Sequence, residues 1–430
     1  MPTTLEEWLS LLEDRHHTAI DLGLDRCRDV WHRMGRPIPG GRVFVVAGTN
    51  GKGSTVATIC SLLGALGFRY GCYTTPHIHQ YNERVQVNGQ SASDELIIKS
   101  FEKVEAALGD VSLSYFEFGT LGAFQLLSEQ DLDFAVMEVG LGGRLDAVNL
   151  LDADCAVITP IGLDHQDYLG DNLESIGREK AGIIRGGQPL VCGQAEPPDS
   201  VLDKASRLDA PVQLLGRDFS IEREAGHSRF CVADNCLQLP LPVLRGEHQL
   251  NNAATGLAAV LQLLPEAIKQ PDALSRGLAS VDLKGRFDQV GERPDIWIDV
   301  GHNPLGAGVI AQTLRKRGAG EGRRIRCVLA MLIDKDAEAV VAELQAVING
   351  WYCAGLSGDR GQSGQDLGRR VASVVDPGQV SVFDGVEEAL RAALKDSDPD
   401  DGVLVFGSFH TADEADHMML EFQTGHGAKG

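Results

Sequence analysis

The sequence predicts an α/β protein built from parallel sheets that are covered by helices. Short apolar runs alternate with helical segments along most of the 430 residues. Polar and charged side chains gather where the predicted strands end. A glycine-rich turn joins the apolar run 43–47 to a helix expected over about 54–66. Parallel strands explain all three observations, because open α/β sheets bind ligands beyond the carboxyl ends of their strands.

The length of the chain indicates more than one hydrophobic core, because a domain usually has roughly 150 residues. We expect a first domain over residues 1–294, with a β-rich portion near 199–244, and a smaller α/β domain over 295–430. The second domain should be doubly wound and Rossmann-like, but it has no G-x-G-x-x-G turn and therefore no assigned dinucleotide. Strands are expected at 43–47, 134–139, 156–159 and 189–192, and then at 295–300, 325–330, 351–354, 380–383 and 403–406.

Composition excludes several classes of partner. A net charge of −22 and a pI near 4.9 disfavour nucleic acid and anionic membranes, because the long-range field repels a polyanion. The chain lacks a leader-like start and an apolar run of membrane-spanning length, so we expect a cytoplasmic protein. We separately expect a monomer. Nine cysteines occur singly, without C-x-x-C or zinc spacing, and are expected to be reduced core residues.

The turn after the first strand is typical of a phosphate cradle. Gly48, Gly51 and Gly53 free the backbone to curl, so that successive N–H groups and the start of the next helix point at one anion, while Lys52 adds a positive charge. The pattern departs from G-x-x-x-x-G-K-[ST], because its first glycine is absent and Gly53 separates Lys52 from Ser54. A turn with no ligand would need neither the lysine nor the hydroxyls. A polyphosphate nucleotide is therefore the expected occupant.

Three further strand ends carry candidate metal ligands. Glu138 ends an apolar strand, where nucleotide-binding enzymes often place an acid that holds magnesium; otherwise it faces solvent. His165 follows the next strand and is equally compatible with a structural role. Thr75 offers a hydroxyl, or belongs to a plain X-Pro turn. Lys180 lies in a segment, 174–182, that by spacing alone is a solvated helix face.

Two other clusters allow more than one interpretation. Asp299, His302 and Asn303 stand at a strand end in the second domain, where polar groups can reach a cleft between domains. By alternation alone, Phe116 and Phe118 would be core residues of a short strand.

Taken together, the motifs resemble those of the Mur ligase superfamily, and within it the dihydrofolate synthase/folylpolyglutamate synthase family, from about Trp8 to His417. Their ordered occurrence carries the resemblance. The motifs are IDLGL at 20–24, AGTNGKGS at 47–54, TTPH at 74–77, YFEFG at 115–119, EVGLGGRLD at 138–146, LDH at 163–165, REKAG at 178–182, NAA at 252–254, GRF at 285–287, DVGHNP at 299–304 and GSFH at 407–410.

The resemblance implies an ATP-dependent, ADP-forming ligase that joins L-glutamate to dihydropteroate and to reduced folates through an acyl phosphate. It implies magnesium ligands at Thr75, Glu138 and His165; the family commonly has serine at the first position. Lys52 and Lys180 complete the catalytic set, and Lys180 falls where the family carries a carbamylated lysine that supports a second magnesium. The implied nucleotide contacts are Asn50, Gly51, Lys52, Gly53, Ser54, Asn252, Arg286 and Asp299.

The implied substrate contacts suit a flat heterocycle with donor groups. They are Asp21, Leu22, Gly23, Tyr115, Phe116, Glu117, Leu145, Asp146, Ala147 and, from the second domain, His302. Two alternatives remain open. A regulatory P-loop NTPase would turn over nucleotide without an acceptor. Another Mur-type ligase would act on a UDP-sugar peptide, although the short region before the P-loop leaves no room for a UDP-binding domain.

Overall fold

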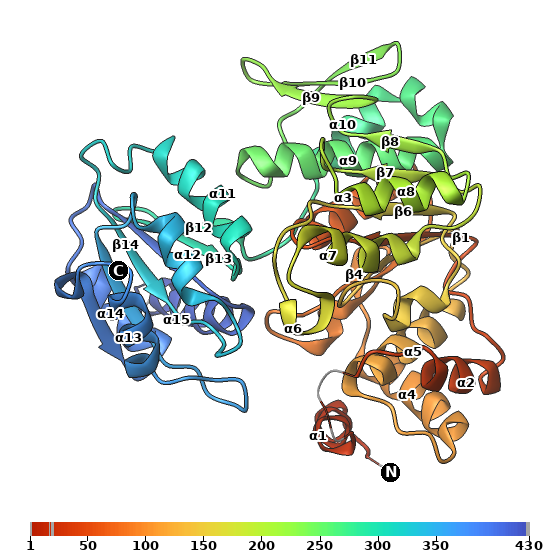
Figure 1. The fold of residues 1–430 in the computed structure, drawn as a ribbon, viewed down its shortest axis with the longest axis horizontal. Helices are drawn as coiled ribbons and strands as arrows, with labels where there is room; N and C mark the ends of the chain where they lie inside the picture. Colours follow the sequence, from red (N-terminus) through yellow and green to blue (C-terminus); the bar gives the residue numbers. More distant parts are fainter. Residues whose placement is uncertain (1, 17, 19–20, 427–430) are drawn as a thin grey trace. The chain divides into compact units, whose positions relative to one another are not determined.

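The computed structural model describes residues 2–16, 18 and 21–426, so Ile20 of the first motif lies outside the described residues. The chain divides into two compact units. The first comprises Met1–Val243 and His248–Asp282, and the second comprises Leu244–Glu247 and Leu283–Gly430. Figure 1 shows both units, coloured along the sequence. Most of the second unit starts at Leu283, earlier in the sequence than the division expected after residue 294. The reason is that the strand 286–291 pairs with the strand 295–299 of the second unit.

The first unit is built around an eight-stranded sheet with helices on both faces. Six neighbouring strands, β2, β5, β1, β6, β7 and β8, run parallel to one another. A short antiparallel ribbon, β3 and β4, extends the edge of the sheet next to β2. In the order in which they lie in the sheet, the strands are β4 (Gln90–Ser91), β3 (Val85–Val87), β2 (Tyr70–Tyr73), β5 (Phe134–Glu138), β1 (Arg42–Ala47), β6 (Cys155–Ile158), β7 (Leu190–Cys192) and β8 (Val212–Leu214).

Alternate residues of β1 enter different cores. Val43 and Val45 belong to the core that α1, α4, α5, α7 and α8 help to build, while Phe44 and Val46 belong to the core under α3, α9 and α10. A strand buried on both faces reads as a continuous apolar run, which explains why β1 was predictable. The helices of this unit are α1 (Leu5–Arg15), α2 (Asp25–Arg33), α3 (Lys52–Ala65), α4 (Asp94–Leu108), α5 (Tyr115–Ser128), α6 (Gln166–Leu169), α7 (Leu173–Lys180), α8 (Asp199–Arg207), α9 (Glu247–Leu263) and α10 (Pro271–Ala279).

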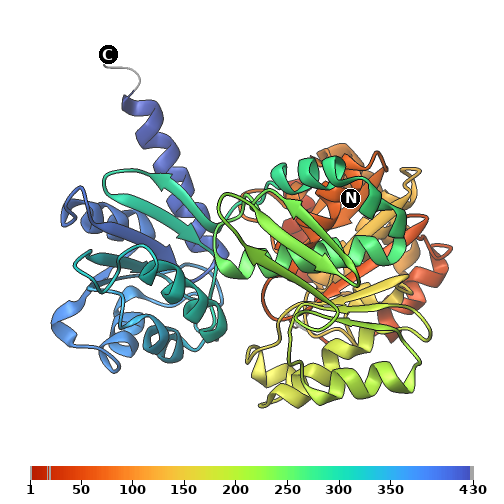
Figure 2. The same cartoon turned by 90° about the horizontal axis from the view of Figure 1, so that it is seen from above.

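A separate antiparallel sheet of three strands, β9 (Phe219–Arg223), β10 (Ser228–Val232) and β11 (Asn235–Leu239), follows α8 and β8. Figure 2 shows it beside α9 and α10, where Phe219, Phe230 and Leu239 enter the second core of the unit. The segment 199–244 therefore begins with a helix and becomes β-structure only afterwards.

One expectation about the cysteines is wrong. Cys231 and Cys236 form a disulfide, because they face each other directly in the β10–β11 pairing with their Cα atoms 4.1 Å apart. A spacing of five residues carries no such signal until the hairpin register is known. The remaining seven cysteines are buried and free, as predicted.

The second unit holds a six-stranded sheet with helices around it. Its strands, in spatial order, are β12 (Arg286–Gly291), β13 (Asp295–Asp299), β17 (Gly402–Phe406), β14 (Ile325–Leu329), β15 (Gly350–Ala354) and β16 (Val380–Phe383). Strand β12 runs antiparallel to β13, and the other neighbours are parallel. The sequence did not predict β12, whose residues fall within the first domain expected over 1–294. The helices are α11 (Pro304–Arg315), α12 (Ala337–Leu344), α13 (Gly364–Ala372), α14 (Val386–Lys395) and α15 (Phe409–His426).

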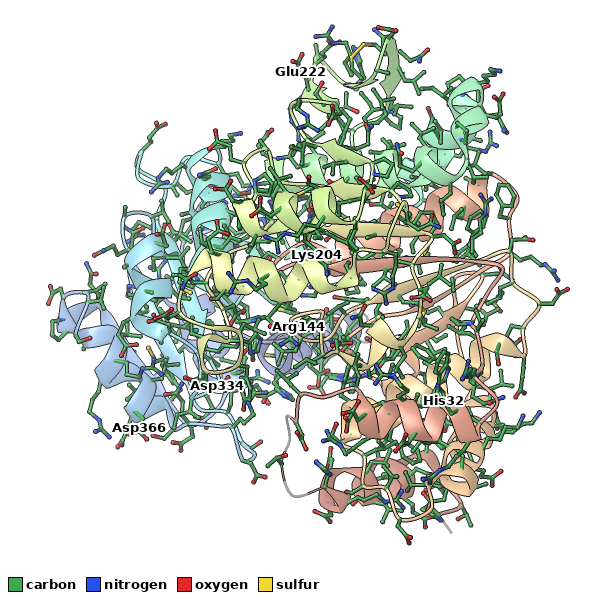
Figure 3. The ribbon with its side chains drawn as sticks, turned by 45° about the vertical axis from the view of Figure 1, so that its right-hand side comes forward. His32, Arg144, Lys204, Glu222, Asp334 and Asp366 are labelled. Atoms are coloured by element: carbon green, nitrogen blue, oxygen red, sulfur yellow. A yellow bond between two sulfur atoms is a disulfide. The ribbon has the colours of Figure 1, made fainter. Side chains whose placement is uncertain are left out.

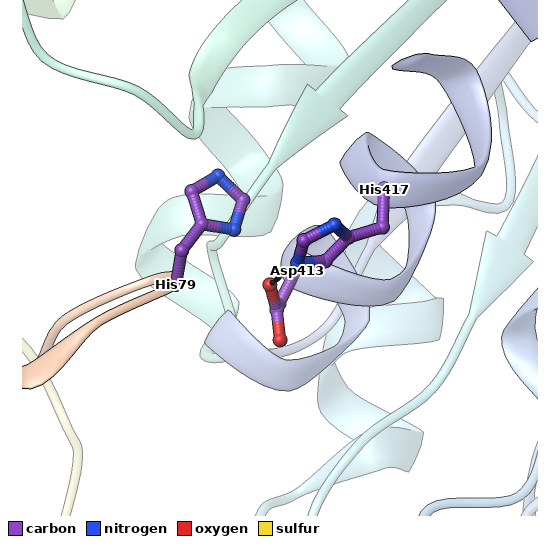
Figure 4. A group of neighbouring side chains, drawn as sticks. All are labelled: His79, Asp413 and His417. Atoms are coloured by element: carbon purple, nitrogen blue, oxygen red, sulfur yellow. Dashed lines mark ion pairs between the residues drawn. The ribbon is translucent and has the colours of Figure 1, made fainter. Parts of the chain in front are cut away.

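Helix α15 carries an exposed ion pair between Asp413 Oδ1 and His417 Nε2, 3.2 Å apart and one turn from each other (Figure 4). Such surface pairs contribute little to stability. Among the described residues, no helix combines the length and the apolar character needed to cross a bilayer.

Candidate active site

The glycine-rich turn between β1 and α3 depends on two glycines. Gly51 is the N-cap of α3 and has a left-handed backbone with φ +86°, which other residues adopt only with strain. A Cβ on Gly51 would lie 2.4 Å from Asn252 Oδ1, and one on Gly48 would lie 1.7 Å from Thr159 Oγ1. The turn is therefore packed against α9 and against the residue that follows β6. Both neighbours hold it in a fixed shape.

Two lysines meet at the carbonyl oxygen of Gly48. Lys52 Nζ donates to it at 3.1 Å, and Lys180 Nζ donates to it at 2.7 Å. Lys180 ends α7 and is buried; burial, followed by the charge of Lys52, lowers its pKa from 10.5 to about 7. Much of its population is therefore a neutral amine near neutral pH. Lys180 lies in the interior of the unit. The expectation that the segment 174–182 is a solvated helix face is therefore wrong for this residue.

The start of α3 presents buried hydroxyl groups. Ser54 and Thr55 are almost fully buried, and their hydroxyl oxygens have no hydrogen-bond partner within the described chain. Buried polar atoms are rarely left in this state, and an unmade hydrogen bond costs about 1–3 kcal/mol. With the N-terminus of the helix and Lys52 beside them, these groups match the needs of a phosphate and its metal ion. The cradle thus fits a nucleotide phosphate.

The candidate metal ligands follow adjacent strands. Strands β2, β5, β1 and β6 are consecutive in the sheet, so Thr75, Glu138, the glycine-rich turn and His165 all lie at its carboxyl edge. Glu138 is buried, and its Oε2 accepts the backbone N–H of Thr75 at 3.2 Å. His165 is the N-cap of α6 with φ +52°, and its Nε2 lies 3.9 Å from Asp164 Oδ1. This set of oxygen donors fits magnesium, while an imidazole is a less typical ligand for it.

The loop that follows β5 is attached to α7. Arg144, labelled in Figure 3, donates from Nε and Nη2 to Glu179 Oε1 at 3.0 and 2.9 Å, and its backbone N–H donates to the Glu179 carbonyl at 2.8 Å. These bonds fix the position of Lys180, the next residue along α7. Other labelled side chains in Figure 3, such as Lys204 and Glu222, are exposed.

A second group of predicted residues gathers around the start of α5. Arg26 bridges two acids, since Nη1 lies 2.9 Å from Asp21 Oδ2 and Nη2 donates to Glu117 Oε1 at 2.8 Å. Ser114 and Glu117 form a capping box that begins the helix, so the interpretation of Phe116 and 118 as strand residues is wrong. The aromatic residues of this motif follow a helical period instead.

Asp146 lies near this group in a buried position. Its two oxygens accept the backbone N–H groups of Leu141 and Val148 at 2.8 and 2.9 Å. Burial nevertheless dominates and raises its pKa from 3.8 to about 7. A carboxyl group poised in this way can accept or donate a hydrogen bond to a heterocycle. Leu145 precedes it, Ala147 starts the following 3-10 helix, and Leu22 and Gly23 are half-buried ahead of α2.

The predicted residues of the second unit lie around the end of β13. The antiparallel register pairs Arg286 with Asp299, which explains how residues from two motifs become neighbours. Burial raises the pKa of Asp299 to about 6, even though Gly301 N–H donates to its Oδ1 at 2.7 Å. His302 Nδ1 lies 3.0 Å from the Val300 carbonyl oxygen. Asn303 is the N-cap of α11 and accepts from Gly306 N–H, which is a structural role.

Sequence reasoning missed Arg26 and Arg84. Arg26 lies in a short, mostly charged helix, where nothing in the pattern distinguishes it from a solvated residue. Arg84 follows two acid or amide residues at the edge of the sheet and is buried. Only the fold brings either guanidinium to the predicted motifs.

Comparison with known proteins assigns the family. The Mur ligase middle domain matches residues 46–260, and the Mur ligase, glutamate ligase domain matches residues 285–409. A dihydrofolate synthase/folylpolyglutamate synthase of Escherichia coli is 43% identical over 408 residues, which cover 95% of this chain and 93% of that protein. The chain belongs to the dihydrofolate synthase/folylpolyglutamate synthase family of Mur ligases.

Solved structures agree with this assignment. Escherichia coli FolC in complex with DHPP and ADP has a TM-score of 0.91 and 41% identity, over 98% of this chain and 99% of that one. A bifunctional folylpolyglutamate synthase/dihydrofolate synthase with Mn, AMPPNP and L-glutamate bound has a TM-score of 0.86 and 40% identity, over 98% of each chain. The predictions of the fold class and of an ADP-forming folate ligase are confirmed. The comparisons do not favour a regulatory NTPase or a different Mur-type ligase.

Proposed function

We propose that this chain adds L-glutamate first to dihydropteroate and then to reduced folates, with ATP converted to ADP and phosphate. The observation that carries the proposal is the cradle after β1. There, two lysines share the Gly48 carbonyl oxygen, beside buried hydroxyls that lack partners within the described chain. The charge of Lys52 and the unused hydrogen-bonding capacity of these hydroxyls call for an anion.

The nucleotide is proposed to bind along the turn. Gly51 and Gly53 supply backbone N–H groups, Ser54 a hydroxyl, and Lys52 a charge directed at the phosphates, and Asn50 is proposed as a further contact from the same turn. Asn252 touches the turn from α9, so its amide is placed to contact the same ligand. Arg286 and Asp299 of the second unit are proposed as further nucleotide contacts, and His302 as a substrate contact.

Thr75, Glu138 and His165 are proposed to hold magnesium. When bound there, the ion would neutralise charge on the phosphoryl oxygens during transfer. Two ions are proposed in total, the second supported by a carbamylated Lys180. The lowered pKa of this lysine, about 7, supports that modification. A neutral amine can attack the carbon of CO2, form a C–N bond and release its proton to water, which leaves an anionic carbamate.

The chemistry proceeds through an acyl phosphate. A carboxylate resists attack by an amine because its oxygen is a poor leaving group. An oxygen of the acceptor carboxylate attacks the γ-phosphorus, and the P–O bond to ADP breaks. The neutral amine of glutamate then attacks the carbonyl carbon, the C–O bond to phosphate breaks, and the amine proton goes to solvent. Lys52 stabilises the charge of the transferring phosphoryl group through preorganised electrostatics.

The acceptor is proposed to bind around α5. Tyr115 and Phe116 offer aromatic surface, and Glu117 and Asp146 offer carboxyl groups for the donors of a pterin ring. Asp21, Leu22 and Gly23 line the same region through the bridge that Arg26 makes from Asp21 to Glu117. Leu145 and Ala147 flank the acid on the other loop.

One assay tests the proposed function. Purified protein is incubated with ATP, magnesium and L-glutamate, and either dihydropteroate or tetrahydrofolate is added. We expect ADP and a glutamate conjugate with each acceptor, and little ADP without one. Absence of both conjugates would contradict the proposal. We also propose that the active species is a monomer, which light scattering at assay concentration would test.

A further inference from the structure

Arg84 is a buried cation. It ends the 3-10 helix Tyr81–Arg84, immediately before β3, and its relative exposure is 8%. An arginine side chain stays protonated in proteins, so its charge is retained in this interior position. Burying an unpaired charge is costly, and native proteins therefore pair buried arginines with an anion.

The groups around the Arg84 guanidinium are neutral. Nε donates to His77 Nδ1 at 2.9 Å, so this nitrogen carries no proton of its own. The guanidinium lies 5.2 Å from the ring centroid of Tyr81 and 5.5 Å from that of Tyr115. Burial raises the pKa of Tyr115 to about 12, so that ring stays uncharged. Tyr73 is the other tyrosine near Arg84, and burial raises the pKa of its hydroxyl as well.

Within the described chain, no carboxylate lies within ion-pair distance of Arg84. Two other partly buried arginines do have a carboxylate partner. Arg26 contacts Glu117 at 2.8 Å, and Arg326 contacts Asp401 at 2.7 Å. The aromatic faces and the imidazole satisfy part of the hydrogen-bonding and electrostatic needs of Arg84, but none of them provides a full negative charge.

Arg84 also stands between two groups of proposed site residues. Its carbonyl oxygen accepts the backbone N–H of Thr74 at 2.8 Å, and the next residue, Thr75, contacts Glu138. Its guanidinium faces Tyr115 on the other side. Arg84 therefore contacts Tyr115 of the proposed acceptor site and the residue next to Thr75 of the proposed metal site.

We infer that Arg84 binds the carboxylate of the pterin acceptor and so directs it toward phosphoryl transfer. The inference rests on the proposed function. A carboxylate is the anion that the acceptor brings, and a guanidinium recognises it by charge-assisted hydrogen bonds. Tyr115 and Arg84 would then bind different ends of one molecule.

Binding measurements with two probes test this inference. One probe is dihydropteroate, and the other is its analogue with hydrogen in place of the carboxylate. The wild-type protein should bind dihydropteroate at least about tenfold more tightly than the analogue, since a charge-assisted hydrogen bond contributes about 1.5–3 kcal/mol. Arg84→Met should lose this discrimination and keep its affinity for the analogue. Arg84→Lys, which retains the charge, should recover part of it.

The matched control is Arg42→Met. Arg42 also lies over an aromatic ring, 4.4 Å from the Phe134 centroid. It begins β1, however, so it lies at the amino ends of the parallel strands, away from the carboxyl ends where the proposed site is. This variant should discriminate between the probes as the wild type does. If Arg84→Met still prefers dihydropteroate, or loses affinity for both probes equally, the inference is wrong and the proposed function is unaffected. If wild-type protein binds neither probe, both proposals fail.

Discussion

Substituting Gly51 by alanine tests the shape of the nucleotide cradle. The new alanine would have to keep the backbone at φ +86°, which costs about 1–2 kcal/mol for a residue other than glycine. Its Cβ adds a second effect. It would also lie 2.4 Å from Asn252 Oδ1 and force that buried amide to move. The Asn252 amide donates to Gln249 Oε1 at 3.0 Å, and breaking such a buried bond costs about 1–3 kcal/mol. Asn252 is a proposed nucleotide contact, and displacing its amide should cost the nucleotide one hydrogen bond worth about 1–3 kcal/mol, so nucleotide affinity should fall by roughly 5- to 150-fold.

Gly67→Ala is the matched control at the other end of α3. Gly67 has nearly the same φ, +88°, but a Cβ there meets nothing within 4 Å. This variant should lose about 1–2 kcal/mol of unfolding free energy from backbone strain alone. Titration calorimetry with AMPPNP and magnesium should give the control wild-type affinity. Wild-type affinity in Gly51→Ala would refute the argument that the contact with Asn252 shapes the binding site.

Three other substitutions give separate tests. Lys52→Ala should reduce ligation by at least about 100-fold while unfolding free energy changes by less than about 1 kcal/mol, and full activity would contradict its role. Glu138→Gln should weaken Mn²⁺ binding in the presence of AMPPNP by at least about tenfold, as measured by electron paramagnetic resonance; an unchanged affinity would remove it from the metal site. In CO2-free buffer, the unfolding free energy of wild type should rise between pH 7 and 10 relative to Lys180→Met. The folded-state pKa of Lys180, about 7, lies below the ordinary 10.5, so the unfolded chain binds more protons in that window. Equal slopes would refute the lowered pKa.

Features that the sequence predicted share a local physical cause. The run that forms β1 is apolar on both faces because helices cover both, and the glycines after it are required by backbone conformation and close packing. The end of β5 at Glu138 was visible for the same reason. Such signals lie in consecutive residues, so they can be recognised before the fold is known.

Features that it did not predict depend on contacts between distant segments. Phe116 and Phe118 alternate as in a strand, yet the capping box at Ser114 starts a helix there. The disulfide needed the register of the β10–β11 hairpin, and β12 needed β13 as its partner. Arg84 became a candidate only when its burial and its neutral neighbours were known.

The central claim is that the acceptor carboxylate takes the γ-phosphoryl group of ATP before glutamate attacks. Dihydropteroate labelled with ¹⁸O in both carboxylate oxygens tests it directly, with ATP, magnesium and L-glutamate in ordinary water. Each released phosphate should carry a single ¹⁸O atom, since the carboxylate oxygen that attacked phosphorus leaves with it. Phosphate free of ¹⁸O, formed together with the glutamate conjugate, would contradict the account.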